Sequence, residues 1–176
     1  MIGAASLGAV CLAAFPLATN YYRTYYGTRE PFYGSPVPAF SSWVKIRNDP
    51  YGKGAFGASR NGGRVHQGLD LVTRAGYPVF AAKSGRVAFS GDAKGYGLST
   101  DILHPDGLRS RYAHLSALDV QAGDWVVKEQ IIGKSGKTGN AQNPHITPHL
   151  HFEIRNRETA LNPTANLLDP SIVISY

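Results

Sequence analysis

The segment 148-PHLHFEI-154 alternates polar and apolar side chains from His149 onward, as a β-strand with one buried face does. On such a strand His149, His151 and Glu153 project from one face. The opposite face consists of Leu150, Phe152 and Ile154. We therefore expect this strand to bury its apolar face in a core. Its polar face should hold two histidines with Cα atoms roughly 6.5–7 Å apart.

Short runs of the same β-rich character precede this segment, and turn residues such as Pro105-Asp106-Gly107 separate them. The further predicted strands are Leu69–Thr73, Pro78–Ala82, Arg86–Ser90, Thr100–His104, Arg109–His114 and Trp125–Val127. Apart from the N-terminal segment, the only helix candidate is a short one at Pro163–Leu168. The pattern predicts an all-β fold.

The composition fits one globular domain, because the 176 residues are 43% hydrophobic and 17% charged. A single cysteine, Cys11, excludes an intramolecular disulfide. The formal net charge of +6 favours anionic partners. Nucleic acid is not an expected partner, since the basic residues are scattered and no nucleic-acid-binding motif is present. A monomer is expected.

The N-terminal stretch Ile2–Ala18 carries no charged residue. We interpret residues 1–19 as a signal peptide or an N-terminal anchor, so the protein is expected to be exported. If the segment is an anchor, it associates the protein with the membrane. The charges of Arg23 and Arg29 after the segment are unusual for an export signal. The alternative interpretation is a buried N-terminal helix.

Residues 20–42 are rich in Tyr, Pro, Gly and Ser, and their prolines disfavour regular helix. We expect this stretch to be an extended connector. The folded domain is predicted to cover residues 43–176.

A second chemical pattern is His66-Gln67-Gly68-Leu69-Asp70, with a histidine and a carboxylate four residues apart. A straight strand would separate them by roughly 13 Å, too far for both to bind one metal. The backbone must therefore bend between them, and Gly68 permits such a bend. A third pattern is 110-SRYAHL-115, where strand alternation predicts Ser110, Tyr112 and His114 on one face.

Taken in order, the motifs 66-HQGLDL-71, 112-YAHLS-116, 136-GKTGN-140 and 148-PHLHFEI-154 resemble the lysostaphin-type (LytM-like) zinc endopeptidases, which cut peptidoglycan peptides. The resemblance covers about residues 43–168. It implies a compact, mostly antiparallel β-sheet core crossed by a groove. It also implies one zinc ion, Zn²⁺, per chain, bound by His66, Asp70 and His151. His149 and His114 then correspond to the catalytic pair.

The chemistry of these residues agrees with that assignment. Two histidines and one carboxylate leave the fourth tetrahedral position of zinc open, as in catalytic zinc sites. Zinc lowers the pKa of a bound water toward about 7 and polarises the scissile carbonyl. No HExxH motif supplies a glutamate base, so the two remaining histidines are expected to share the proton transfers and the stabilisation of the oxyanion. The sequence leaves open which histidine is the base.

We therefore expect a zinc-dependent endopeptidase that hydrolyses peptide cross-links of peptidoglycan in the periplasm, the cell wall or the extracellular space. One alternative is a non-catalytic relative that binds the wall or activates another hydrolase. It is disfavoured because all five positions are filled. A lipoyl-like or biotinyl-like carrier is the other alternative, and it has no use for these histidines. The bond that is cut stays open.

Other polar residues have simpler interpretations. His104 is expected to be structural and His145 to be a solvated loop residue. Tyr112 either lines the groove or packs in the core. Glu153 is assigned to a surface salt bridge, the alternative being a partner that orients a histidine. Arg60 and Arg64 flank the approach to His66 and are candidates to meet a peptide carboxylate, the alternative being ordinary exposed arginines.

Overall fold

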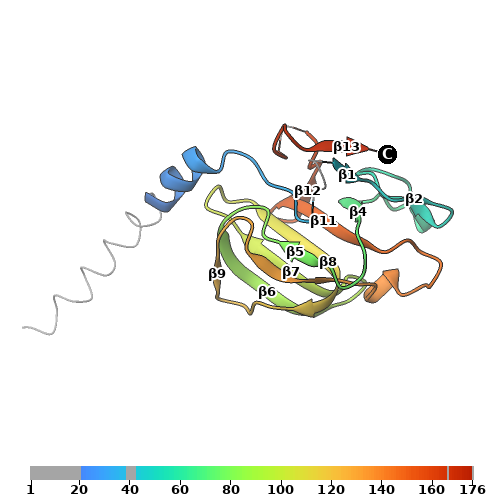
Figure 1. Cartoon of the computed structure of the whole chain (residues 1–176). Coiled ribbons are helices and arrows are strands. Elements are labelled where there is room, and N and C mark those ends of the chain that lie inside the picture. The colour runs from blue at the N-terminus through green and yellow to red at the C-terminus, as the bar shows by residue number, and fades with distance from the viewer. Residues whose placement is uncertain (1–20, 39–42, 166, 176) are drawn as a thin grey trace, which may run out of the picture.

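The structure is a computed structural model that describes residues 21–38, 43–165 and 167–175. It confirms the all-β prediction (Figure 1). Two short 3-10 helices, η1 (Asn61–Gly63) and η2 (Gly139–Ala141), interrupt the strands. The strands are β1 (Trp43–Lys45), β2 (Asn48–Asp49), β3 (Gly52–Lys53), β4 (Leu69–Val72), β5 (Pro78–Phe80), β6 (Gly85–Ala93), β7 (Gly97–Leu103), β8 (Arg109–Leu118), β9 (Trp125–Val126), β10 (Ile131–Ser135), β11 (His149–Asn156), β12 (Thr159–Leu161) and β13 (Val173–Ser175).

The main sheet of the described residues has nine strands, all paired antiparallel. Its central path runs β12-β11-β8-β7-β6-β9, while β4 pairs with β11, and β10 pairs with both β8 and β5. Two small sheets accompany it, the β2–β3 hairpin and the parallel pair of β1 with β13. The strand order places β11 between β4 and β8, and these three strands carry most of the site described below.

The hydrophobic core forms against β11, as the alternation of its sequence predicts. Leu150, Phe152 and Ile154 are fully buried and pack with Leu69 of β4 and Tyr112 of β8. The rings of Tyr112 and Phe152 lie 5.4 Å apart. The Tyr112 hydroxyl accepts a hydrogen bond from the backbone N–H of Ala82. Of the two interpretations of Tyr112, the packed core residue is therefore the one observed.

The prediction of an extended connector over residues 20–42 was wrong in its described part. Residues 21–29 form a helix, which is possible because the first proline of the stretch is Pro31. Tyr33 and Val37 are buried in the core, so the folded unit begins well before Trp43. Tyr33 exchanges backbone hydrogen bonds with residues 167 and 169 near the C-terminus. Residues 20 and 39–42 lie outside the described residues.

Two further expectations concern the ends of the chain. The helix expected at Pro163–Leu168 is not found, since residues 163–165 and 167 form turns and Leu168 bridges to Tyr33. The predicted signal peptide or anchor at 1–19 lies outside the described residues. Within the part of the chain that the structure describes, no helix is both long and apolar enough to cross a membrane.

Candidate metal centre

His66, Asp70 and His151 converge at one point. Asp70 on β4 is the direct register partner of His151 on β11, so both side chains occupy the same face of the sheet. Asp70 Oδ1 lies 2.9 Å from His66 Nε2 and 2.8 Å from His151 Nδ1. The two histidine nitrogens are 3.0 Å apart. Together the three buried side chains form a group of donors that could hold a metal ion, as found among the described residues.

The predicted bend between His66 and Asp70 is present, and it falls at Gly68. A side chain at this position would collide with the Phe152 carbonyl oxygen and would come within 2.9 Å of the Glu153 side chain. Gly68 is therefore required because β11 passes directly against it. Permitting a bend, the reason given from the sequence, is secondary.

The remaining nitrogen of each imidazole is fixed by a hydrogen-bond acceptor. His66 Nδ1 donates to the Ala55 carbonyl at 2.9 Å, so Nε2 is the nitrogen that faces Asp70 and could bind a metal. His151 Nε2 donates to the Glu153 carboxylate at 2.9 Å. Burial opposes the charge on His151, but its hydrogen bonds to Asp70 and Glu153 raise its pKa to about 9, so a metal must displace the Nδ1 proton. With that proton displaced, two imidazoles and one carboxylate oxygen fit zinc.

The second oxygen of Asp70 is occupied by two arginines. Oδ2 accepts from Arg47 Nη2 at 3.0 Å and from Arg60 Nη2 at 3.2 Å, so Oδ1 alone faces the histidines. Burial raises the pKa of Asp70, but the hydrogen bonds from His151 and His66 outweigh it and hold the pKa well below its usual range. Arg60 thus contacts a site carboxylate, and its contact with a peptide stays a prediction. Arg47 was not predicted, because it lies 23 residues before Asp70 and belongs to no local pattern.

Glu153 corrects another expectation, because it is fully buried and forms no surface salt bridge. Its carboxylate accepts from His151 Nε2, from the Tyr96 hydroxyl at 2.9 Å and from Arg155 Nη1 at 2.6 Å. Burial raises its pKa, but these donors lower it to about 2. Arg111 stacks over the Tyr96 ring at 4.4 Å. The observed role is the alternative one, a partner that orients His151.

His149 and His114 stand beside this group. Their rings lie 5.2 Å apart, edge to face, and the His114 ring lies 5.8 Å from that of His151. His149 Nδ1 donates to the Thr147 carbonyl at 2.7 Å, and its Nε2 is 3.8 Å from Asp70 Oδ1. Burial lowers the pKa of both imidazoles, that of His114 to about 3 with further help from His151 and His149. Both rings are therefore neutral and retain an Nε2 lone pair.

The expectation that Tyr112 and His114 share a face was wrong. Between Tyr112 and Leu115, β8 has two residues opposite the single residue Ser99 of β7, which is a β-bulge. His114 adopts a left-handed conformation there, with φ of 64°. The extra residue lets Tyr112 and Leu115 both face the core, and it turns His114 toward His149.

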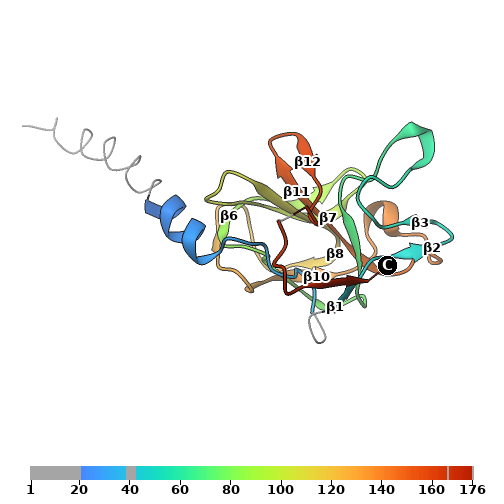
Figure 2. The same cartoon turned by 90° about the horizontal axis from the view of Figure 1, so that it is seen from above.

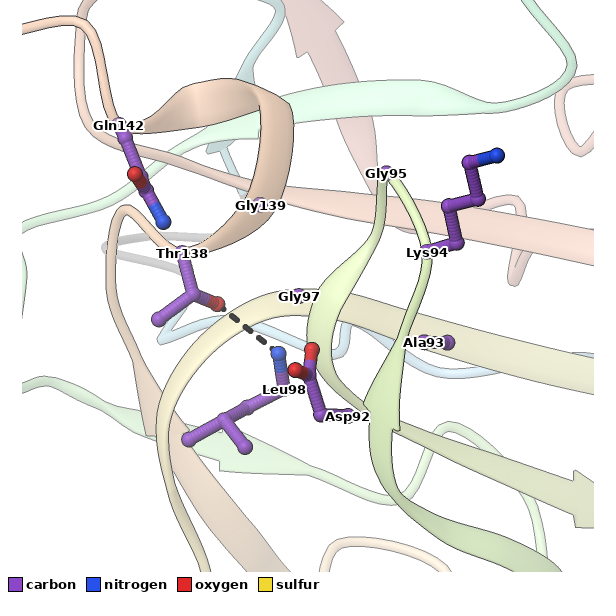
Figure 3. A pocket seen from close by; sticks show the side chains of 9 residues that line it. All are labelled: Asp92, Ala93, Lys94, Gly95, Gly97, Leu98, Thr138, Gly139 and Gln142. Atoms are coloured by element: carbon purple, nitrogen blue, oxygen red, sulfur yellow. Dashed lines mark hydrogen bonds between the residues drawn. The ribbon is translucent and has the colours of Figure 1, made fainter.

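The 136–140 motif holds this bulge in place. The Thr138 carbonyl accepts from His114 Nδ1 at 2.9 Å. The Thr138 hydroxyl donates to the Leu115 carbonyl and accepts from the backbone N–H of Leu98. Thr138 and Leu98 both line a hollow between the β6–β7 turn and η2 (Figure 3). A side chain at Gly97 or Gly139 would collide with the facing backbone, so both glycines allow this close approach. The motif thus positions His114.

Two other histidines lie outside the cluster of five site residues, which are His66, Asp70, His114, His149 and His151. His104 is buried between the Ser84 carbonyl and the Ser110 hydroxyl, which fits the structural interpretation. His145 is exposed in its loop and stacks on Tyr51, with ring centroids 6.0 Å apart.

The sequence profile of Peptidase family M23 matches residues 64–163, more than half of the chain and all five residues of the cluster. The chain belongs to peptidase family M23. This family resemblance, expected from the order of motifs, is thereby confirmed.

Individual relatives place this M23 chain near known peptidases. It is 37% identical to lysostaphin of Staphylococcus simulans over 115 residues, which cover 64% of the chain and 22% of lysostaphin. The structure of the catalytic domain of that antimicrobial peptidase matches with a TM-score of 0.56 and 38% identity, over 66% of this chain and 89% of the domain. A zinc-containing peptidase of Vibrio cholerae matches at 0.58 and 28% identity, over 76% and 41% of the two chains.

The name of a further relative does not describe it as a peptidase. Stage II sporulation protein Q of Bacillus subtilis is 37% identical over 110 residues, which cover 61% of this M23 chain and 38% of that protein. The matched regions cover less than half of the length of the sporulation protein and of lysostaphin. Membership of the M23 family therefore gives the fold and the peptidase relationship, and the activity has to be argued from the residues of the site.

Proposed function

We propose that the protein is a zinc-dependent endopeptidase that hydrolyses peptide cross-links of peptidoglycan outside the cytoplasm. The observation that carries the proposal is the convergence of Asp70 Oδ1 with one nitrogen each of His66 and His151, next to two neutral histidines that are not part of the donor group. A structural zinc site uses four protein ligands, and here three are supplied. The arrangement therefore suits catalysis better than a purely structural role.

Each residue then has a definite task. His66 Nε2, Asp70 Oδ1 and His151 Nδ1 would hold zinc, which when bound acidifies a water and polarises the scissile carbonyl. His149 and His114 each offer an Nε2 lone pair, because Nδ1 of each is committed to a backbone carbonyl. One of them accepts a proton from the attacking water at Nε2, becomes an imidazolium and can pass that proton to the departing amine. The other also lacks a proton on Nε2, so it can donate a hydrogen bond to the developing oxyanion only after it has taken one up.

Three features support a cell-wall substrate. The net charge of +6 favours adsorption to polyanionic peptidoglycan, with salt weakening the attraction. Lysostaphin, of which the catalytic domain is matched, is described as an antimicrobial peptidase. The uncharged stretch Ile2–Ala18 is consistent with export to the compartment where this substrate occurs.

The proposal is tested by incubating the full chain and zinc with purified sacculi of different cross-link chemistry. We expect new free amino groups and no new reducing sugars, and we expect the His151→Ala variant to release neither. New reducing ends without peptide cleavage would indicate a glycosidase. A zinc-loaded protein that binds every wall and cleaves none would be a wall-binding or activating relative.

Replacing Glu153 with Gln is expected to weaken zinc binding by about tenfold to a hundredfold, the usual effect of losing the charged partner of a metal-binding histidine. The amide keeps the volume of the side chain, but it no longer stabilises the proton on His151 Nε2 as a carboxylate does. Competition with a chelator measures the affinity. Glu158→Gln is the control, because that carboxylate is exposed and remote from His151. Equal zinc affinity in both variants would contradict the orienting role of Glu153.

A further inference from the structure

An aromatic cluster joins the helix of residues 21–29 to the edge of the main sheet. The rings of Tyr22 and Tyr26 each lie 5.6 Å from the ring of Trp125 on β9. They also stack on each other, with centroids 6.3 Å apart and planes 9° from parallel. Tyr21 stacks on Tyr25 in the same way one residue earlier. The helix is thereby held against β9, at one end of the domain (Figures 1 and 2).

The residues after the helix tie it to the core. The Glu30 carboxylate accepts from the backbone N–H and the hydroxyl of Ser84, at 2.7 and 2.6 Å. The Tyr33 hydroxyl donates to Asp106 at 3.1 Å, and the buried Lys83 forms an ion pair with the same carboxylate at 2.7 Å. These contacts fix the helix of residues 21–29 relative to the domain.

Several large apolar side chains at this end remain exposed. Tyr21 is 64% exposed, Tyr22 48%, Trp125 44% and Val127 51%. We call these four residues the aromatic end surface. Three arginines accompany them. Arg23 and Arg29 are exposed on the helix, and Arg86 is the register partner of Trp125. The exposed carboxylate of Glu129 also lies in this region of the chain, close to Val127 in sequence.

The uncharged stretch Ile2–Ala18 ends three residues before Tyr21, so in the sequence an apolar segment directly precedes the aromatic end surface. Tyr and Trp are the residues that concentrate at the headgroup level of bilayers, and arginines next to them attract anionic lipids. We propose that the aromatic end surface rests on an anionic lipid bilayer. Tyr21, Tyr22 and Trp125 lie at headgroup depth, and residues 2–18 enter the same membrane.

This orientation has a consequence that rests on the proposed function. The hairpin β2–β3, η2 and the loop that leads into β11 lie at the end of the domain opposite to the helix in both views (Figures 1 and 2). His149 is the first residue of β11, so the candidate metal centre lies near the end of the strand into which that loop leads. A domain seated on the aromatic end surface would hold the site away from the bilayer and toward a substrate outside it.

The two tryptophans of the chain provide the test. The Trp43→Phe variant leaves Trp125 as the only tryptophan, and the Trp125→Phe variant leaves Trp43, which is 58% exposed on β1. Each full-length variant is bound to vesicles of phosphatidylglycerol and phosphatidylcholine that carry nitroxide-labelled lipids. We expect the fluorescence of Trp125 to shift to the blue and to be quenched several-fold, and the fluorescence of Trp43 to stay unchanged.

A pair of surface substitutions checks that the contact runs through the aromatic end surface. Val127→Glu places a charge beside Trp125 and is expected to abolish most of the quenching. Val173→Glu changes another exposed valine, on β13, and should leave the quenching intact. Vesicles of phosphatidylcholine alone should quench Trp125 less than the anionic vesicles do.

Three outcomes would overturn the proposal. Unquenched Trp125 in vesicle-bound protein would show that residues 2–18 alone bind the membrane and that the aromatic end surface does not contact it. Equal quenching of both tryptophans would exclude a fixed orientation. Equal quenching of Trp125 in neutral and anionic vesicles would remove the anionic lipid from the proposal. None of these measurements involves zinc or peptidoglycan, so their failure is distinct from a failure of the proposed endopeptidase activity.

Discussion

The His151→Ala variant is expected to lose nearly all of the zinc that the unmodified chain binds at about one ion per chain. His151 Nδ1 is one of three converging donors, and two donors alone form a weak site. The loss should be visible by metal analysis of the purified protein after dialysis. Cleavage of sacculi should disappear with the metal.

This substitution is preferred to a change at Asp70. Asp70 Oδ2 also binds Arg47 and Arg60, so its removal would leave a buried arginine short of a partner and would destabilise the fold. His145→Ala is the matched control, because it removes a histidine of the exposed loop that lies outside the donor group. Undiminished zinc in the His151 variant, or equal losses in both variants, would contradict the ligand assignment.

The parts of this site that the sequence predicts are those set by local periodicity. Alternation along β11 is a property of one strand, and it places His149 and His151 opposite the buried Leu150 without reference to any other strand. The bend before Asp70 likewise follows from local sequence, because His66 and Asp70 are four residues apart and a straight strand would separate them too far to bind one metal. The expected zinc-binding positions therefore lie close together in the structure.

The parts that the sequence does not predict depend on the pairing of distant segments. The bulge at His114 comes from the register of β8 against β7, and alternation along β8 alone gave the wrong face. Arg47 reaches Asp70 only because its segment packs beside β4. The burial of Glu153 needed the donors Tyr96 and Arg155, of which Tyr96 comes from another part of the chain.

The predicted connector, residues 20–42, shows a different limit of prediction from the sequence. Its composition of Tyr, Pro and Gly indicated an extended connector, because composition reports the conformational preference of the free chain. Tyr33 is nevertheless buried, because its hydroxyl bonds to Asp106 in the β7–β8 turn, its ring packs against His104, and its backbone pairs with residues 167 and 169. Tertiary contacts of this kind override local conformational preference. The folded unit therefore begins before the predicted boundary at Trp43.

The catalytic pair gives the second large expected effect. Replacing His149 with Ala should lower turnover by about 10²–10⁴-fold while zinc is retained, which is the usual contribution of a positioned acid or base. The Nε2 of His149 lies 3.8 Å from Asp70 Oδ1, close to the donor group without belonging to it. The expected signature is a fall in kcat for cleavage of sacculi or a derived peptide, with an unchanged zinc content.

His114 requires a variant that respects its backbone. Its φ of 64° lies in the left-handed region, which Asn tolerates better than Ala, so His114→Asn is the suitable substitution. The amide side chain cannot exchange a proton as an imidazole does, and turnover should again fall by about 10²–10⁴-fold. A melting temperature close to that of the unmodified chain would show that the bulge is intact.

The comparison of metal content with turnover separates the two roles. A base or acid variant keeps the ion and loses the rate, whereas a ligand variant loses both. If the His149 variant lost zinc as completely as the His151 variant, the ligand and the proton-transfer group would have to be exchanged. If the His114 variant kept full turnover, the geometry that turns His114 toward His149 through the β8 bulge would be structural only. The proton transfers would then fall to His149 alone.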